Sequence, residues 1–317
     1  MAQFSLVRMT PPILLAVPNV SEGRDARTIE ELGAAFHSGD GPGDVRLLDV
    51  HSDVDHHRAV FTLAGTPRAL EEGLLRGARV AVGSIDVMAR AAADPSDAGA
   101  HPHVGVIDVV PLVYLGARAR GSACAAALVV ADRIAGELQL PVFLYGELTG
   151  EQGRTRAELR RGGIPGLAAR MAGKAGPQGA LRPDFGPPAM HPSAGATLVA
   201  AREPLVAFNL QLQAPADIAD ARRVAALIRD GGEHGLQGVR AIGVQLGGGV
   251  AQVSMNVERP LELTLAEVVE AVGGHARIAS AELVGLAPRA ALEGFPEDLP
   301  LPGFDPARHV IENALGS

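Results

Sequence analysis

The stretch VRAIGVQLGGGVAQVSMNV, residues 239–257, contains two apolar runs joined by three glycines. The runs 239–246 and 250–257 have the length of strands, and a short glycine connection is typical of a β-hairpin. Thr264 and Glu267 follow with the spacing of a capping box, which predicts a helix from there to about residue 272. A hairpin followed by a helix is the centre of a βαββαβ unit.

The flanking segments complete that unit. Residues 205–212 alternate like a half-buried strand, 217–229 have helical spacing, and 281–286 form a closing strand. The second half of the chain is therefore predicted to be β-α-β-β-α-β, the ferredoxin-like order.

The first half repeats this order. Strands are expected at 13–17, 45–50, 58–63 and 106–115, with helices at 25–37 and from Thr66, where Pro67 takes the first helical position. A helix at 122–138 and a strand at 142–145 follow; residues 146–192 are less regular, with one short helix at 155–161. We predict an α+β protein of two ferredoxin-like subdomains, residues 1–204 and 205–317, with a ligand cleft between them.

Composition excludes several kinds of partner. The 317 residues carry 36 acidic and 28 basic side chains, a net charge of −8, with 3% aromatic residues and no tryptophan, so nucleic-acid binding is not expected. The apolar runs 13–17 and 123–131 are too short for a membrane span. Cys124 is the single cysteine, which favours a reducing cytoplasm.

The first candidate site is the turn at 17–25, VPNVSEGRD, between a strand and a helix. Free backbone N–H groups at a helix start favour an anionic ligand, and Asn19 can contribute a side chain to it. The alternative is that Asn19 or Ser21 only caps the turn.

A dense polar segment, DVHSDVDHHR, occupies residues 49–58. Three interpretations remain open: a divalent metal site, for which imidazole and carboxylate are suitable ligands; a substrate site in which Arg58 holds a carboxylate while a histidine or aspartate transfers protons; or a solvated acidic loop. The candidate side chains are His51, Asp53, Asp55, His57 and Arg58.

Two histidines, His101 and His103, flank Pro102 just before a predicted strand. The proline restricts the backbone of His101, which suits a side chain that must keep one orientation. A histidine both accepts and donates protons near neutral pH, so a general acid–base role and a purely structural role are equally open.

A long proline- and glycine-rich loop covers residues 183–197 and leads into a strand. Gly186 and Gly195 permit close approach of the backbone to a flat ligand, and His191 and Ser193 offer polar contacts. A loop of this length with rigid composition is predicted to be functional.

Several of these motifs, in this order, resemble the formiminotransferase family, in its stand-alone bacterial form. The resemblance is carried by residues 17–23 (VPNVSEG), 101–111, 141–147 (PVFLYGE), 183–197, 207–209 (AFN), 252–256 (QVSMN) and 284–286 (VGL). It covers most of the chain, from about residue 15 to 292.

The resemblance implies a cytoplasmic homodimer that moves a formimino group from N-formimino-L-glutamate to N5 of tetrahydrofolate. Tetrahydrofolate is then a co-substrate bound between the subdomains, and no metal is expected. The family's catalytic histidine falls on His101. Its folate-binding segment falls on Gly186, Pro187, Pro188, Ala189, Met190, His191, Pro192, Ser193, Ala194 and Gly195. The substrate-binding candidates are Asn19, His51, Asp53, His57, Arg58 and His103.

Three of these positions depart from the family pattern: His51, His57 and His103. A diverged member could perform formyl transfer between 5-formyltetrahydrofolate and glutamate instead, or bind folate without turnover. The alternative from another enzyme class is a metal-dependent hydrolase, which would use His51, Asp53, Asp55, His57, His101 and His103.

Overall fold

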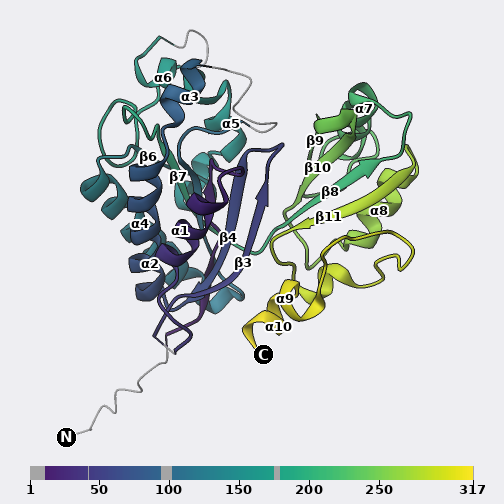
Figure 1. Ribbon diagram of the computed structural model, residues 1–317, viewed down its shortest axis with the longest axis horizontal. Coiled ribbons are helices and arrows are strands. Elements are labelled where there is room, and N and C mark those ends of the chain that lie inside the picture. Colours follow the sequence, from purple (N-terminus) through teal and green to yellow (C-terminus); the bar gives the residue numbers. More distant parts are fainter. Residues whose placement is uncertain (1–10, 42, 94–101, 175–178, 317) are drawn as a thin grey trace, which may run out of the picture.

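The computed structural model describes residues 11–41, 43–93, 102–174 and 179–316 and contains two β-sheets whose inner faces are turned toward each other. Figure 1 shows helices α1, α2 and α4 outside the first sheet and α7 and α8 outside the second. The layers therefore run helix, sheet, sheet, helix. This confirms the α+β class and the pair of sheet subdomains.

The second subdomain matches its prediction closely. Its sheet has the order β11-β8-β10-β9, and every neighbouring pair is antiparallel, which is the ferredoxin-like arrangement. Gly247–Gly249 joins the two hairpin strands, and the capping box at Thr264 is present. The elements are β8 (Val206–Leu212), α7 (Ile218–Ile228), β9 (Val239–Gln245), β10 (Ala251–Val257), α8 (Leu265–Gly273) and β11 (Ile278–Val284).

The first subdomain contains the same order with an interruption. Strands β1 and β2 both pair with β4 and β5, so they act as one strand broken at Val17 and Pro18. Thr66 caps α2 with Pro67 at its start, as predicted. The elements are β1 (Leu14–Ala16), β2 (Asn19–Val20), α1 (Ala26–Phe36), β3 (Arg46–Asp53), β4 (Arg58–Gly65), α2 (Pro67–Ser84), α3 (Val87–Ala93) and β5 (Ile107–Val113).

An α/β extension then widens this first sheet. Strand β7 pairs in parallel with both β5 and β6, which the predicted crossover helix α4 makes possible. The short helix near 155–161 is confirmed as α5, whereas α3 and α6 were not predicted. The elements are η2 (Ala117–Ala119), α4 (Arg120–Leu138), β6 (Val142–Leu144), η3 (Gly146–Gln152), α5 (Arg156–Arg160), α6 (Gly163–Met171) and β7 (Thr197–Arg202).

Strand β3 corrects one boundary. We expected the strand to end at residue 50 and a polar loop to follow, but the ladder with β4 continues to the pair Asp53–Arg58. The polar residues stay in the strand because their backbone groups bond to β4. Alternate side chains of a strand share a face, so His51 and Asp53 point the same way.

The two sheets use their faces differently. On β8, Val206, Phe208 and Leu210 are buried in the core beneath α7 and α8. The intervening Asn209 and Gln211 lie on the opposite, inner face. The inner face of the second sheet is therefore rich in polar side chains, although it is directed toward the other subdomain.

The C-terminal segment returns to the first sheet. It contains η6 (Arg289–Leu292), α9 (Pro306–His309) and α10 (Ile311–Leu315). Ile311 packs with Leu15, Val113 and Leu286 in a small apolar cluster that joins both subdomains. The change of sheet falls between β7 and β8, and we keep residues 1–204 and 205–317 as a proposed division. Across the described residues, no helix has both the length and the apolar content to traverse a membrane.

Candidate functional site

A cleft of about 890 Å³ lies between the inner faces of the two sheets. The first sheet provides Leu15, Asn19, Val60 and Pro111 among its walls, and the second provides polar side chains of β8 and β10. Those polar residues are Asn209, Ser254 and Asn256. A cleft lined by apolar side chains with a few polar groups among them suits a flat organic ligand that carries hydrogen-bonding groups.

Four arginines reach this cleft: Arg58, Arg156, Arg160 and Arg202. Arg58 begins β4 and Arg202 ends β7. Arg156 and Arg160 are four residues apart on α5, so they share one face of that helix. Three elements that are separate in the sequence therefore place positive charge at one location.

Only Arg160 of these four has an ion-pair partner in the described part of the chain, namely Asp108. Arg202 donates to the backbone carbonyl oxygen of Glu203 at 2.8 Å, and its Nε is buried without a partner. No described side chain forms a hydrogen bond or ion pair with Arg58 or Arg156. Buried charges are normally paired, so three guanidinium groups are left to attract an anion.

The pKa values show the cost of this arrangement. Burial, together with the neighbouring positive charges of Arg160 and Arg156, lowers the pKa of Arg58 to about 10, although the nearby carboxylates act in the opposite direction. Burial also lowers the pKa of Arg202, to about 10, and it lowers the pKa of Arg156. An anionic ligand reverses this cost, because an opposite charge favours the charged form of arginine.

A smaller cavity of about 260 Å³ shares Asn19 and Arg58 with the cleft. His57, Pro102 and His103 complete its walls together with other residues of the β2 turn. His101, the predicted acid–base residue, lies outside the described residues. The two residues that follow it, Pro102 and His103, face a space that adjoins the arginines.

The backbone N–H groups of the turn after β2 donate hydrogen bonds to side chains of the protein itself. The N–H groups of Arg24 and Asp25 donate to one oxygen of Glu22, at 2.9 and 3.0 Å. Gly23 donates to Nδ1 of His57 at 3.2 Å. The anion expected at this helix start is therefore the chain's own Glu22 carboxylate, and the side chain that caps α1 is Asp25 instead of Asn19 or Ser21.

The segment Gly186–Gly195 is held against the strand that follows the His101 motif. Val106 donates to the carbonyl oxygen of Ala194 at 2.9 Å, and a Cβ at Gly195 would lie 2.4 Å from the carbonyl oxygen of Val104. Nδ1 of His191 accepts the N–H of Ala194 at 3.0 Å and so organises the loop. None of these ten described residues lines the 890 Å³ cleft.

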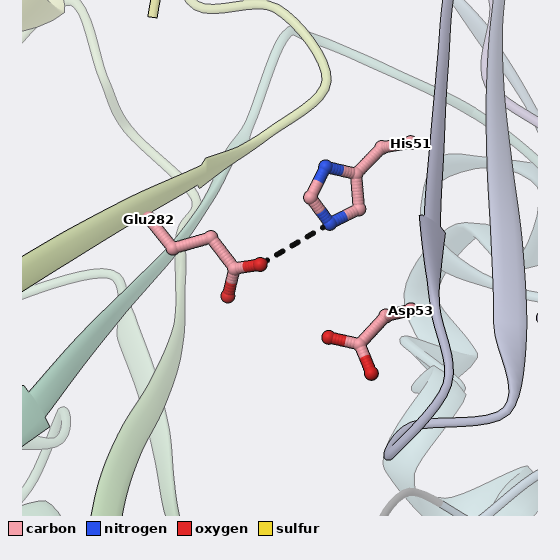
Figure 2. Close-up of side chains that lie close together, drawn as sticks. All are labelled: His51, Asp53 and Glu282. Atoms are coloured by element: carbon pink, nitrogen blue, oxygen red, sulfur yellow. Dashed lines mark ion pairs between the residues drawn. The ribbon is translucent and has the colours of Figure 1, made fainter. Parts of the chain in front are cut away.

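His51 and Asp53 do not line the cleft, although Asp53 is the cross-strand partner of Arg58; they lie at the side of the interface where β3 faces β11. Nε2 of His51 is 3.3 Å from Oε1 of Glu282, and Asp53 is beside this pair (Figure 2). Burial would raise the pKa of Asp53, but hydrogen bonds and charge from His56 lower it to about 2. The carboxylate is therefore ionised at neutral pH.

The set predicted for a hydrolase does not form one cluster among its described members. His51 and Asp53 meet Glu282, whereas the His57 ring contacts the N–H of Gly23. Asp55 lies across the interface from Gly247. A Cβ atom added at Gly247 would be 3.0 Å from Oδ1 of Asp55. Of the predicted substrate residues, Asn19 and Arg58 line the cleft; His57 and His103 line the adjoining cavity.

Sequence patterns did not single out Arg156, Arg160, Arg202 or Glu282. The i, i+4 spacing of arginines in the predicted helix at 155–161 was a usable signal for the first two. Arg202 and Glu282 gave none, because their position depends on how the subdomains pack.

Two ferredoxin-like subdomains facing each other across an arginine-lined cleft define a class of α+β protein with a charged cleft at its subdomain interface. Residues 13–202 match the formiminotransferase domain, N-terminal subdomain. The chain is 34% identical over 311 residues to the glutamate formimidoyltransferase of Streptococcus pyogenes serotype M1, covering 96% of this chain and 98% of that protein. It belongs to the formiminotransferase family, as the sequence motifs predicted.

Two further relatives show the range of this similarity. The glutamate formimidoyltransferase of Thermoplasma acidophilum is 29% identical over 306 residues, covering 94% of this chain and 96% of that protein. The formimidoyltransferase-cyclodeaminase of Gallus gallus is 35% identical over 288 residues, which are 87% of this chain and 50% of the relative. The chain thus spans about half the length of that larger protein.

Proposed function

We propose that this protein is a glutamate formimidoyltransferase, which transfers the formimino group of N-formimino-L-glutamate to N5 of tetrahydrofolate. The observation that supports this most strongly is the set of half-buried arginines without an ion-pair partner among the described residues, in the interface cleft of a chain that aligns over nearly its whole length with glutamate formimidoyltransferases. Both proposed substrates carry glutamate carboxylates, which such arginines bind well.

The arginines supply the binding energy. Arg58, Arg156 and Arg202 approach the cleft from different elements, so they can hold carboxylates at separate points and fix the orientation of the donor and the folate. Holding two reactants in one geometry contributes several kcal/mol of rate acceleration. Asn19 and Asn256, which also line the cleft, are suited to hydrogen bonds with the amide and pterin groups.

His101 supplies the proton transfers. N5 of tetrahydrofolate attacks the amidine carbon of the donor while the imidazole takes the N5 proton. The imidazolium then returns a proton to the glutamate nitrogen, the bond between that nitrogen and the amidine carbon breaks, and glutamate leaves. General acid–base help of this kind contributes roughly 10²- to 10⁴-fold.

The segment Gly186–Gly195 is our proposed pterin contact. Its support is indirect: the backbone of Ala194 and Ala196 is hydrogen-bonded to residues 104–106, which directly follow the His101 motif. A ligand contacting this segment would therefore lie near residues 104–106. The resemblance further suggests a homodimer and a cytoplasmic location, which light scattering and cell fractionation can establish.

A donor-exchange assay tests the function. Purified protein is mixed with tetrahydrofolate and N-formimino-L-glutamate, and free glutamate is measured; one glutamate is expected for each folate converted. Parallel reactions omit folate or replace the donor with N-formyl-L-glutamate. Release without folate would indicate a hydrolase, release only from the formyl donor would indicate formyl transfer, and no release would indicate a folate binder without turnover.

A further inference from the structure

One cluster of metal-ligating side chains lies outside the arginine cleft. His51 and Asp53 come from β3 of the first subdomain, and Glu282 comes from β11 of the second; all three are half-buried (Figure 2). One ligand atom from each residue lies within 4.8 Å of the other two. Distances of this size allow a shared ion after small rotations of the side chains, because ligand atoms about 2 Å from one ion are about 3 to 3.5 Å apart.

We propose that His51, Asp53 and Glu282 bind one divalent transition-metal ion, with Zn²⁺ as the best-matched representative, and that this ion joins the two subdomains. An imidazole nitrogen and two carboxylate oxygens form a mixed donor set that suits Zn²⁺ better than Mg²⁺ or Ca²⁺, which prefer all-oxygen sites. Three protein ligands leave one position for water.

The two carboxylates are already oriented by neighbours. Asn209 donates to Oε2 of Glu282 at 2.7 Å and Gln252 donates to the same oxygen at 3.4 Å, which leaves Oε1 directed at His51. Asp53 is held by the backbone N–H of His56 at 2.7 Å and by its ring at 2.9 Å. Outer hydrogen bonds of this kind are what fix metal ligands in place.

The charge of the cluster calls for a cation. Asp53 and Glu282 are both carboxylates, and one oxygen of each lies within 4.8 Å of the other. Among the described residues, no arginine or lysine forms an ion pair with either carboxylate. Two carboxylates from opposite subdomains and one imidazole therefore point toward a common space (Figure 2), and a divalent ion would neutralise both carboxylates.

The proposed metal site adjoins the arginine cleft through the cross-strand pair Asp53–Arg58 but has a different lining. His51 and Glu282 line a cavity of about 730 Å³ with residues of the C-terminal segment, including Phe304 and His309. None of the three proposed ligands lines the arginine cleft. The ion would connect β3 to β11 and hold the subdomains at a fixed distance, without taking part in formimino transfer.

Zinc titration of metal-stripped, full-length protein tests the site. Calorimetry is expected to give one Zn²⁺ per chain with a dissociation constant in the micromolar range or tighter, and Tm should rise with Zn²⁺ concentration because the ion binds only the native state. His51→Asn and Glu282→Gln should each weaken binding by at least about 10-fold. Co²⁺ absorption of the wild-type protein reports the ligand geometry without any substitution.

Two control variants exclude other zinc sites. His275→Asn removes one ring of the His234–His275 pair, whose centroids are 4.9 Å apart, and Glu262→Gln removes an exposed carboxylate paired with Arg259. Both should bind Zn²⁺ like the wild type. The proposal is overturned if the wild type binds no Zn²⁺, if H51N and E282Q retain wild-type affinity, or if H275N abolishes binding; His51 and Glu282 are then an ion pair only.

Discussion

Two parts of the same subdomain interface carry opposite charge. In the cleft, Arg58, Arg156 and Arg202 have no carboxylate partner, whereas at the β3–β11 side Asp53 and Glu282 have no arginine or lysine partner among the described residues. Asp53 and Arg58 are cross-strand partners on β3 and β4, yet their side chains form no ion pair with each other. Their separation indicates that each part is arranged for a ligand, an organic anion in the cleft and a metal cation at the β3–β11 side.

Substitution of His101 should cause the largest loss of activity. It should affect proton transfer but not substrate binding. His101→Gln should lower kcat by roughly 10²- to 10⁴-fold with little change in KM, because the arginines that bind carboxylates remain. Steady-state kinetics with both substrates measures this. If the variant keeps wild-type kcat, the acid–base assignment is wrong and the cleft alone accounts for catalysis.

Substitution of Arg58 tests whether the cleft arginines bind the substrate carboxylates. Arg58→Met should raise KM for N-formimino-L-glutamate by roughly 10- to 100-fold, with a smaller loss in kcat, since a charge-assisted contact is worth about 1.5–3 kcal/mol. Arg27→Met, at an exposed arginine paired with Glu31 on α1, serves as the control and should change neither constant. An unchanged KM in R58M would remove Arg58 from the binding site.

Arg58→Met, which should weaken substrate binding, should at the same time stabilise the folded, ligand-free protein. The pKa of Arg58 is lowered by burial, so the folded state disfavours its charge, and this cost is present at neutral pH where the arginine is charged in both states. Arg58→Met should therefore raise the free energy of unfolding of the ligand-free protein by about 1–3 kcal/mol. Urea denaturation measures it; a lower stability would mean that Arg58 has a structural partner.

The smallest effect concerns Asp53 on the carboxylate side. Its pKa is lowered from 3.8 to about 2, so its ionised form stabilises the fold fully above pH 3.8, and this contribution disappears as pH falls through 2. After allowance for solvent screening we expect a loss of about 1 kcal/mol in the chelator-treated wild type between pH 5 and pH 2. Asp53→Asn should lack this component; an identical acid profile would refute the coupling to His56.

The sequence predicted the parts of this molecule that depend on local pattern. The glycine-linked hairpin at 239–257 and the capped helix after Thr264 are found where expected, because strand alternation and capping act over a few residues. The end of β3 was predicted too early, since a polar composition concealed backbone pairing with β4. Convergence of Glu282 with His51, or of Arg202 with Arg58, depends on contacts between distant segments and left no local signal.

Folate and its one-carbon donor are proposed to bind in the arginine-lined cleft, and a crystal structure of the complex with folinic acid would show whether they do. We predict that the glutamate carboxylates lie within hydrogen-bonding distance of at least two of Arg58, Arg156 and Arg202, with the pterin directed toward Pro102 and His103. A ligand bound at saturating concentration outside this cleft, or a cleft that stays empty, would contradict the account.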